Sequence, residues 1–247
     1  VIYGQNGSVV WNATLPGNIA TSPVLVRYGT AGLWVAVQSF NTTIVLLERT
    51  YFTLYNDKGQ ESWTKSVALS SFATTVVALP SPAVADLNVD GFAEMAFLSP
   101  FESGAARLYV YKQDGSTLWN PFLLKGQAEA PPAIADIDAD SVPEVVVACW
   151  NYSLPANGRV IVTAVDGKNG TEEWTHSIDR SFDLFTERAA AGPALADLDS
   201  DNATDVVVAG FNGRIYGLGG RTGAELWEYN STRVSLLSAP SVADSES

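Results

Sequence analysis

The chain has 247 residues, of which 47% are hydrophobic and 17% charged, as in a globular protein with a sizeable core rather than a disordered chain. Its net charge of −13 argues against a nucleic-acid partner, because phosphates would repel such a surface. No apolar run approaches the roughly 18 residues that a membrane helix needs, so we expect no membrane span. This length allows one large all-β domain or two small ones.

Tryptophan recurs in register along the whole chain, at spacings of 52 to 56 residues. Each of these tryptophans follows a turn that contains Gly with Asn, Asp or Thr, and a short apolar stretch precedes each turn. Strand, turn and a strand that ends in Trp is the pattern of a β-hairpin. The repeated residues are Trp11, Trp63, Trp119, Trp174 and Trp227.

A second element follows each tryptophan, a proline and a short apolar strand, and a longer β-rich run comes next. Four short antiparallel strands per repeat predict an all-β fold, a β-propeller of four-stranded blades in which Trp fills the wedge between neighbours. One domain over residues 1–247 would hold about four complete blades, as part of a larger propeller. The predicted units are 21–79, 80–129, 130–190 and 191–238, with partial units at 1–20 and 239–247.

Three repeats carry the pattern D-x-[DN]-x-D-x-x-x-[DE] between their first and second strands. Side-chain oxygens at positions 1, 3, 5 and 9, with a backbone carbonyl at position 7, supply the hard oxygen ligands that Ca²⁺ prefers. The predicted ligands are Asp86, Asn88, Asp90, Phe92 and Glu94 in the first loop, Asp136, Asp138, Asp140, Val142 and Glu144 in the second loop, and Asp197, Asp199, Asp201, Ala203 and Asp205 in the third loop.

These loops predict about three calcium ions. Softer metals are not expected, because no His or Cys accompanies the carboxylates. The alternative is a polar turn that caps a strand, since Asp and Asn are common turn residues. The repeat that begins at Pro23 has Arg27 in place of the first Asp and should bind no ion.

The aspartate loops resemble the FG-GAP repeats of integrin α-subunit propellers. The later strands, such as residues 213–227, look like pyrroloquinoline-quinone-type propeller repeats. Together these resemblances cover nearly the whole chain and imply a propeller with structural calcium. The Phe-Gly and Gly-Ala-Pro tripeptides that name FG-GAP are not intact here.

Seven N-x-[ST] sequons occur, more than chance predicts, and several fall in expected turns where a glycan is tolerated. They predict N-linked glycans on a secreted or cell-surface protein. The sequons are Asn6, Asn12, Asn41, Asn151, Asn169, Asn202 and Asn230.

These observations favour an extracellular calcium-binding glycoprotein that acts in adhesion or binds a protein or glycan partner. The alternative is a self-associating structural subunit of a surface layer, filament or appendage. A quinone-dependent dehydrogenase is less favoured, because such enzymes typically add an adjacent cysteine pair and a complete eight-bladed ring. The chain has one cysteine, Cys149, which we expect to be buried, and one histidine, His176, on a predicted outer strand. We therefore expect no enzyme.

Overall fold

A computed structural model of the chain describes residues 2–3, 6–28, 32–42, 47–69, 80–102, 104–128, 130–151, 159–178, 192–209, 213–230 and 239–242. All regular structure in these ranges is β-strand. None of the elements described is a helix long and apolar enough to cross a membrane.

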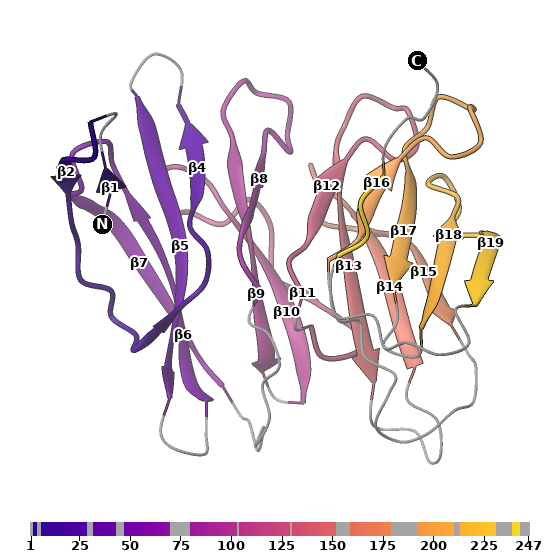
Figure 1. Cartoon of the computed structure of the whole chain (residues 1–247), viewed down its shortest axis with the longest axis horizontal. Coiled ribbons are helices and arrows are strands. Elements are labelled where there is room, and N and C mark those ends of the chain that lie inside the picture. The colour runs from indigo at the N-terminus through magenta and orange to yellow at the C-terminus, as the bar shows by residue number, and fades with distance from the viewer. Residues whose placement is uncertain are drawn as a thin grey trace.

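The strands form four larger sheets that follow a two-stranded hairpin (Figure 1). The hairpin is β1 (Ile2–Tyr3) and β2 (Val9–Trp11). Blade 1 consists of β3 (Ile19–Ala20), β4 (Val24–Arg27), β5 (Leu33–Thr42), β6 (Leu47–Tyr55) and β7 (Glu61–Ala68). Blade 2 consists of β8 (Ala83–Ala85), β9 (Glu94–Glu102), β10 (Ala105–Tyr111) and β11 (Phe122–Leu123). Blade 3 consists of β12 (Ala133–Ala135), β13 (Glu144–Asn151), β14 (Arg159–Asp166) and β15 (Glu172–Ile178), and blade 4 of β16 (Ala194–Ala196), β17 (Asp205–Ala209), β18 (Arg214–Leu218) and β19 (Glu225–Asn230).

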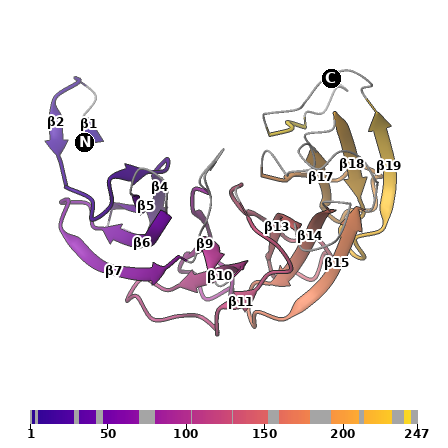
Figure 2. The same ribbon diagram turned by 90° about the horizontal axis from the view of Figure 1, so that it is seen from below.

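Each blade is an antiparallel meander, in which sequence neighbours pair along the sheet. In blade 1, both β3 and β4 pair with β5, so this sheet has a fifth strand. Figure 2 shows the blades side by side in an open arc, with β1 and β2 at one end and β19 at the other. The short strands β4, β8, β12 and β16 contact one another from blade to blade. The predicted all-β propeller architecture is confirmed.

The core lies between the blades, because each sheet is apolar on both of its faces. The middle strand β13 is buried at every position from Glu144 to Trp150, since it packs against blade 2 on one side and blade 4 on the other. Cys149 is fully buried in the cluster between blades 2 and 3, and burial raises the pKa of its thiol to about 12. The expectation of a buried, apolar cysteine is confirmed.

Most of the final partial unit predicted at 239–247 lies outside the described residues, which reach only residues 239–242 there.

Candidate metal-binding loops

The three aspartate loops occupy equivalent places in blades 2, 3 and 4. Each joins the short first strand of its blade to the long second strand, so position 1 follows the first strand and position 9 begins the second. In each loop, the residue before position 1 pairs directly with position 9, as Ala135 does with Glu144. The hairpin register therefore brings position 1 and position 9 to the same end of the blade.

All three loops share a backbone shape that contains two left-handed residues. Position 4 has a positive φ in Val89, Ala139 and Ser200, at 59°, 65° and 63°. Position 6 has a positive φ in Gly91, Ser141 and Asn202, at 89°, 75° and 68°. Because a β-branched residue strongly disfavours this conformation, the loop as a whole must impose it on Val89.

Carboxylates hold the second loop in this shape by accepting backbone N–H groups. Asp136 Oδ1 and Oδ2 accept the N–H groups of Asp140 and Ser141 at 3.1 and 2.9 Å. Asp138 Oδ1 also accepts the Asp140 N–H, at 3.0 Å, and Asp140 Oδ1 accepts the Val142 N–H, at 2.7 Å. These are the bonds of the polar turn that the sequence left open as an alternative, and they occupy only part of the acceptor capacity of the carboxylates.

The carboxylate at position 9 of the second loop is fully buried and only half satisfied. Glu144 Oε2 accepts the N–H of Ile137 at 2.8 Å. Glu144 Oε1 has no hydrogen-bond partner among the described residues. Asp136, Asp138 and Glu144 each place one carboxylate oxygen within 4.8 Å of the other two. Burial raises the pKa of Glu144 to about 8, with smaller contributions from Glu173 and the loop aspartates.

The third loop brings Asp197, Asp199 and Asp205 together within the same limit, yet its buried carboxylate is fully bonded. Asp205 Oδ2 accepts the N–H of Leu198 at 2.8 Å, and Asp205 Oδ1 accepts the N–H of Gly220 at 2.9 Å. Gly220 belongs to the β18–β19 turn of the same blade. No orphan oxygen is therefore left on Asp205.

The first loop repeats the turn with an amide at position 3. Asn88 Oδ1 accepts the Asp90 N–H at 3.0 Å, and its Nδ2 donates to Asp90 Oδ2 at 2.9 Å. Glu94 is buried and accepts the N–H of Leu87 at 3.0 Å, and burial raises its pKa to about 7. At position 7, Phe92 is 52% exposed.

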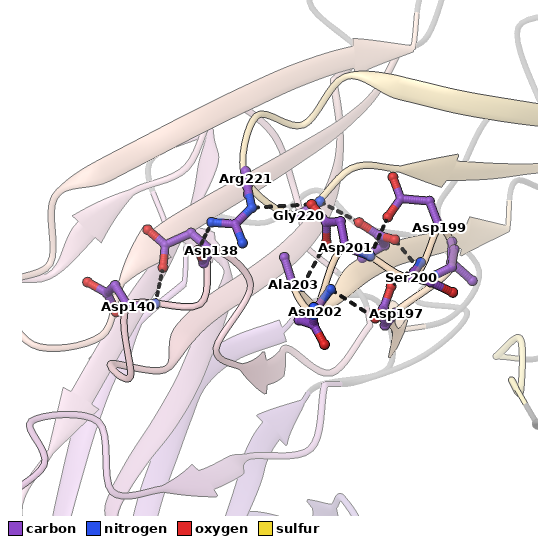
Figure 3. Close-up of polar contacts among 12 residues, drawn as sticks. Asp138, Asp140, Asp197, Asp199, Ser200, Asp201, Asn202, Ala203, Gly220 and Arg221 are labelled. Carbon is purple, nitrogen blue, oxygen red and sulfur yellow. Dashed lines mark hydrogen bonds and ion pairs between the residues drawn. The ribbon is translucent and has the colours of Figure 1, made fainter.

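Arg221 connects the second and third loops across the boundary between blades 3 and 4. Its Nε donates to Asp201 Oδ2 at 3.2 Å, and its guanidinium also donates to the backbone carbonyl of Asp138. Figure 3 shows the guanidinium between the two loops. No sequence pattern predicted this contact, because Arg221 follows Asp138 by 83 residues.

Glu173 was also missed by sequence reasoning. It begins the outer strand of blade 3 together with Glu172, next to the buried Trp174. The residue as a whole is exposed, but partial desolvation of its carboxyl group and the charges of Asp138, Asp166 and Asp140 raise its pKa to about 7. A further titratable carboxyl group thus lies near the second loop.

All seven sequon asparagines fall on described residues. Asn6, Asn12, Asn169, Asn202 and Asn230 are exposed, whereas Asn41 and Asn151 are half-buried. The side chain of Asn169 is engaged in its own turn, where Oδ1 accepts the Thr171 N–H at 2.8 Å. Glycosylation stays a prediction.

A family model described as outer membrane protein assembly factor BamB, of the PQQ type, matches residues 54–246. The chain belongs to this family. No curated protein matches the chain.

Solved structures with a similar fold share little sequence with this chain. The structure of BBS1N in complex with ARL6DN matches at 13% identity and a TM-score of 0.53, over 96% of this chain and 61% of that one. A quinohemoprotein alcohol dehydrogenase from Comamonas testosteroni matches at 12% identity and 0.50, over 80% and 33%. BamB from Moraxella catarrhalis matches at 16% identity and 0.44, over 86% and 52%. This chain therefore spans between a third and three fifths of the length of these structures.

The family match corrects the resemblance to FG-GAP repeats, which is wrong. That resemblance rested on loops of nine residues, whereas the PQQ-type match extends over most of the chain. The functional prediction of an extracellular calcium-binding adhesion glycoprotein is wrong with it, because the family that the match shows is the BamB-like, PQQ-type propeller family. The quinone-type resemblance of the later strands agrees with the family.

Proposed function

We propose that this chain is a non-catalytic propeller segment whose second loop binds a divalent cation, and that the ion fixes one face of the propeller for a protein partner. The observation that carries the proposal is the fully buried Glu144. Its Oε1 has no hydrogen-bond partner among the described residues, and one of its carboxylate oxygens lies within 4.8 Å of oxygens of Asp136 and Asp138. A buried carboxylate oxygen without a partner is destabilising by about 1–3 kcal/mol or more. A cation held between the three carboxylates removes that penalty.

The donor set favours Ca²⁺. Three carboxylates from an irregular loop match the irregular oxygen coordination of Ca²⁺ better than the strict octahedron of Mg²⁺. The loop contains no imidazole or thiolate that would favour zinc or copper. We expect the second loop to bind the ion most tightly, because the Glu at its position 9 has an oxygen without a hydrogen-bond partner among the described residues. The first and third loops are weaker sites.

The ion would act on the packing between blades. Ile137, at position 2 of the second loop, is buried in the cluster between blades 3 and 4. The Ile137 carbonyl also lies against the turn of blade 4, since a Cβ added to Gly220 would come within 2.3 Å of it. An ion that rigidifies the second loop therefore stabilises a junction between two blades.

A protein partner is supported by the description of the family as an assembly factor. The absence of catalysis is supported by the chemistry of the second loop, in which the carboxylates of Asp136 and Asp140 accept backbone N–H groups of the loop itself. The single histidine, His176, lies in the outer strand β15, where it pairs with Val162 of β14, and it is not part of any aspartate loop.

The test compares two isosteric variants, Glu144→Gln and Asp205→Asn. In native mass spectrometry with calcium, the parent chain and Asp205→Asn should each retain a tightly bound ion that Glu144→Gln loses. Calcium should also raise the melting temperature of the first two proteins and not of the third. If Glu144→Gln binds calcium as the parent does, the second loop is an ordinary turn and the proposal fails.

The partner is tested by crosslinking in calcium and in chelator. Crosslinks from a bound protein to the loop face should form with the parent chain in calcium, and they should be lost with Glu144→Gln. Crosslinks confined to other faces would contradict a partner at the loops.

A further inference from the structure

A β-bulge directly before the repeat tryptophan recurs in the outer strands of blades 1, 3 and 4. In blade 3, Trp174 pairs with Ala164 and Glu172 pairs with Val165, so the register with β14 skips Glu173. A bulged residue is released from the alternation of its strand, and bulges often re-aim a side chain. The residues skipped in this way are Ser62, Glu173 and Leu226.

The bulge of blade 4 shows the direction in which such a side chain points. The side chain of Leu226 lies 3.5 Å from where a Cβ on Gly219 would stand. Gly219 begins the β18–β19 turn, where its carbonyl accepts the Gly223 N–H at 2.7 Å. The carbonyl of Asp166 accepts the Gly170 N–H at 2.9 Å in the same way, so Asp166 is the equivalent residue of blade 3. The equivalent direction in blade 3 is toward Asp166.

Asp166 connects this direction with the second aspartate loop. It pairs with Glu144, which is position 9 of that loop. Glu173 interacts electrostatically with Asp166 and with Glu144. It interacts in the same way with the loop residues Asp136, Asp138 and Asp140. The outer strand of blade 3 thus contributes a carboxyl group to the surroundings of the second loop.

Glu173 lies farther out than the three carboxylates that come together in the loop. Asp136, Asp138 and Glu144 place oxygens within 4.8 Å of one another, and Glu173 is not part of that set. Ca²⁺ takes six to eight oxygen ligands, which commonly include water molecules. A carboxylate beyond the ligands can accept a hydrogen bond from such a water molecule and fix its orientation. The exposed position of Glu173 is suited to this role.

We propose that Glu173 is a positioning residue for the ion of the second loop, and that its carboxylate accepts a hydrogen bond from a water molecule bound to that ion. This inference rests on the cation site proposed above. Of the three bulged residues, Ser62 stands in the blade that lacks an aspartate loop, and Leu226 brings no charge to the third loop. The carboxylate stands in the blade whose loop contains the buried Glu144.

The experiment compares the calcium affinities of Glu173→Gln and Glu172→Gln by isothermal titration calorimetry. Glu173→Gln should weaken calcium binding by about tenfold or more, as for other carboxylates that orient metal ligands. Glu172→Gln is the matched control, because it removes the same charge from the adjacent residue, whose carboxylate accepts a hydrogen bond from Lys125 Nζ at 2.7 Å. It should keep the affinity of the parent chain. Melting in chelator checks that both variants fold.

The role of the water molecule is tested with Tb³⁺ in the same loop. Luminescence lifetimes in H₂O and D₂O count the water molecules on the bound ion. Glu173→Gln should keep the count of the parent chain, because the water molecule stays on the ion when its acceptor is weakened. A higher count in this variant would show that Glu173 binds the ion directly, and it would overturn the water-mediated role.

The calcium titrations separate this inference from the cation site itself. If Glu144→Gln loses the ion while Glu173→Gln binds it as the parent does, the site stands and the role of Glu173 is wrong. Equal weakening in Glu172→Gln and Glu173→Gln would reflect the loss of any negative charge and would also overturn the role. A parent chain that binds no calcium would overturn the site and this inference together.

Discussion

The second and third loops have the same motif and the same backbone shape, but they differ in what their buried carboxylate has left to bind. Asp205 is one methylene shorter than Glu144, and both of its oxygens accept backbone N–H groups. Glu144 keeps one oxygen, Oε1, that has no hydrogen-bond partner in the part of the chain that the structure describes. Arg221 forms an ion pair with the Asp201 carboxylate of the third loop but contacts only a backbone carbonyl of the second loop, beside which Glu173 adds a further carboxyl group. A repeated motif therefore does not make equivalent sites. The neighbouring turn and strand decide which charged groups lie near each loop and whether its buried carboxylate keeps an oxygen that can bind an ion.

The largest expected effect is the loss of the ion from the second loop in Asp138→Ala. At a calcium concentration a hundredfold above the dissociation constant, a bound ion stabilises the fold by about 2.7 kcal/mol, and this variant should lose that increment. Asp199→Ala, at the same position of the third loop, should keep the tight ion and its stabilisation. Melting curves with calcium and with chelator measure the stabilisation by calcium in each variant. An equal loss of this stabilisation in the two variants would contradict the difference between the second and third loops.

The pH dependence of stability should differ with and without calcium. Burial raises the pKa of Glu144 from 4.5 to about 8 in the ion-free fold, so the folded state binds a proton that the unfolded state has released. The free energy of unfolding in chelator should therefore fall as the pH rises from about 4.5 to about 8. Glu94, whose pKa is raised to about 7, adds to the same slope.

Glu144→Gln should flatten this slope in chelator, because the amide does not titrate. Calcium should flatten it in the parent chain, since the ion replaces the proton. Denaturant unfolding at several pH values measures the slope, and stability that rises over this range in chelator would contradict the assignment.

A smaller effect is expected from Arg221→Met. Removing the guanidinium from Asp201 should raise the calcium affinity of the third loop by up to about fivefold, because an exposed ion pair is worth about 0.2–1 kcal/mol. The second loop should keep its affinity. Calcium titration of the variant in the Asp138→Ala background isolates the third loop, and an unchanged or weaker affinity would show that Arg221 does not compete with the ion.

The smallest effect concerns the left-handed residue at position 6. Ser141→Gly should stabilise the ion-free fold by up to about 1 kcal/mol, since glycine adopts a φ of 75° without the Cβ penalty. Asn202→Gly should gain less, because Asn tolerates this conformation better than Ser. Denaturant unfolding compares the two, and a larger gain for Asn202→Gly would contradict the comparison.

The sequence predicted the blades because their signals are periodic. Trp63 and Trp174 end hairpins at regular spacing, and the structure places each against the turn of the next blade. The positions of the aspartate loops also followed from the sequence, since the motif is local and its hairpin closes on itself.

Contacts between segments far apart in the chain could not be predicted in this way. The bond of Arg221 to Asp138 depends on how one blade stacks on the next, and the bond of Gly220 to Asp205 depends on how a turn closes over another loop of its own blade. No local pattern encodes either arrangement. The family was misjudged for a related reason. Nine-residue loops carried the FG-GAP resemblance, whereas the match that decides the family extends over residues 54–246.

The most direct test is an anomalous difference map from crystals grown in calcium. The cation proposal predicts a peak in the second loop, coordinated by Glu144 Oε1 and by carboxylate oxygens of Asp136 and Asp138, and stronger than any peak in the third loop. A water molecule that donates a hydrogen bond to Glu144 Oε1, with no anomalous peak, would contradict the proposal and leave all three loops as turns that cap strands.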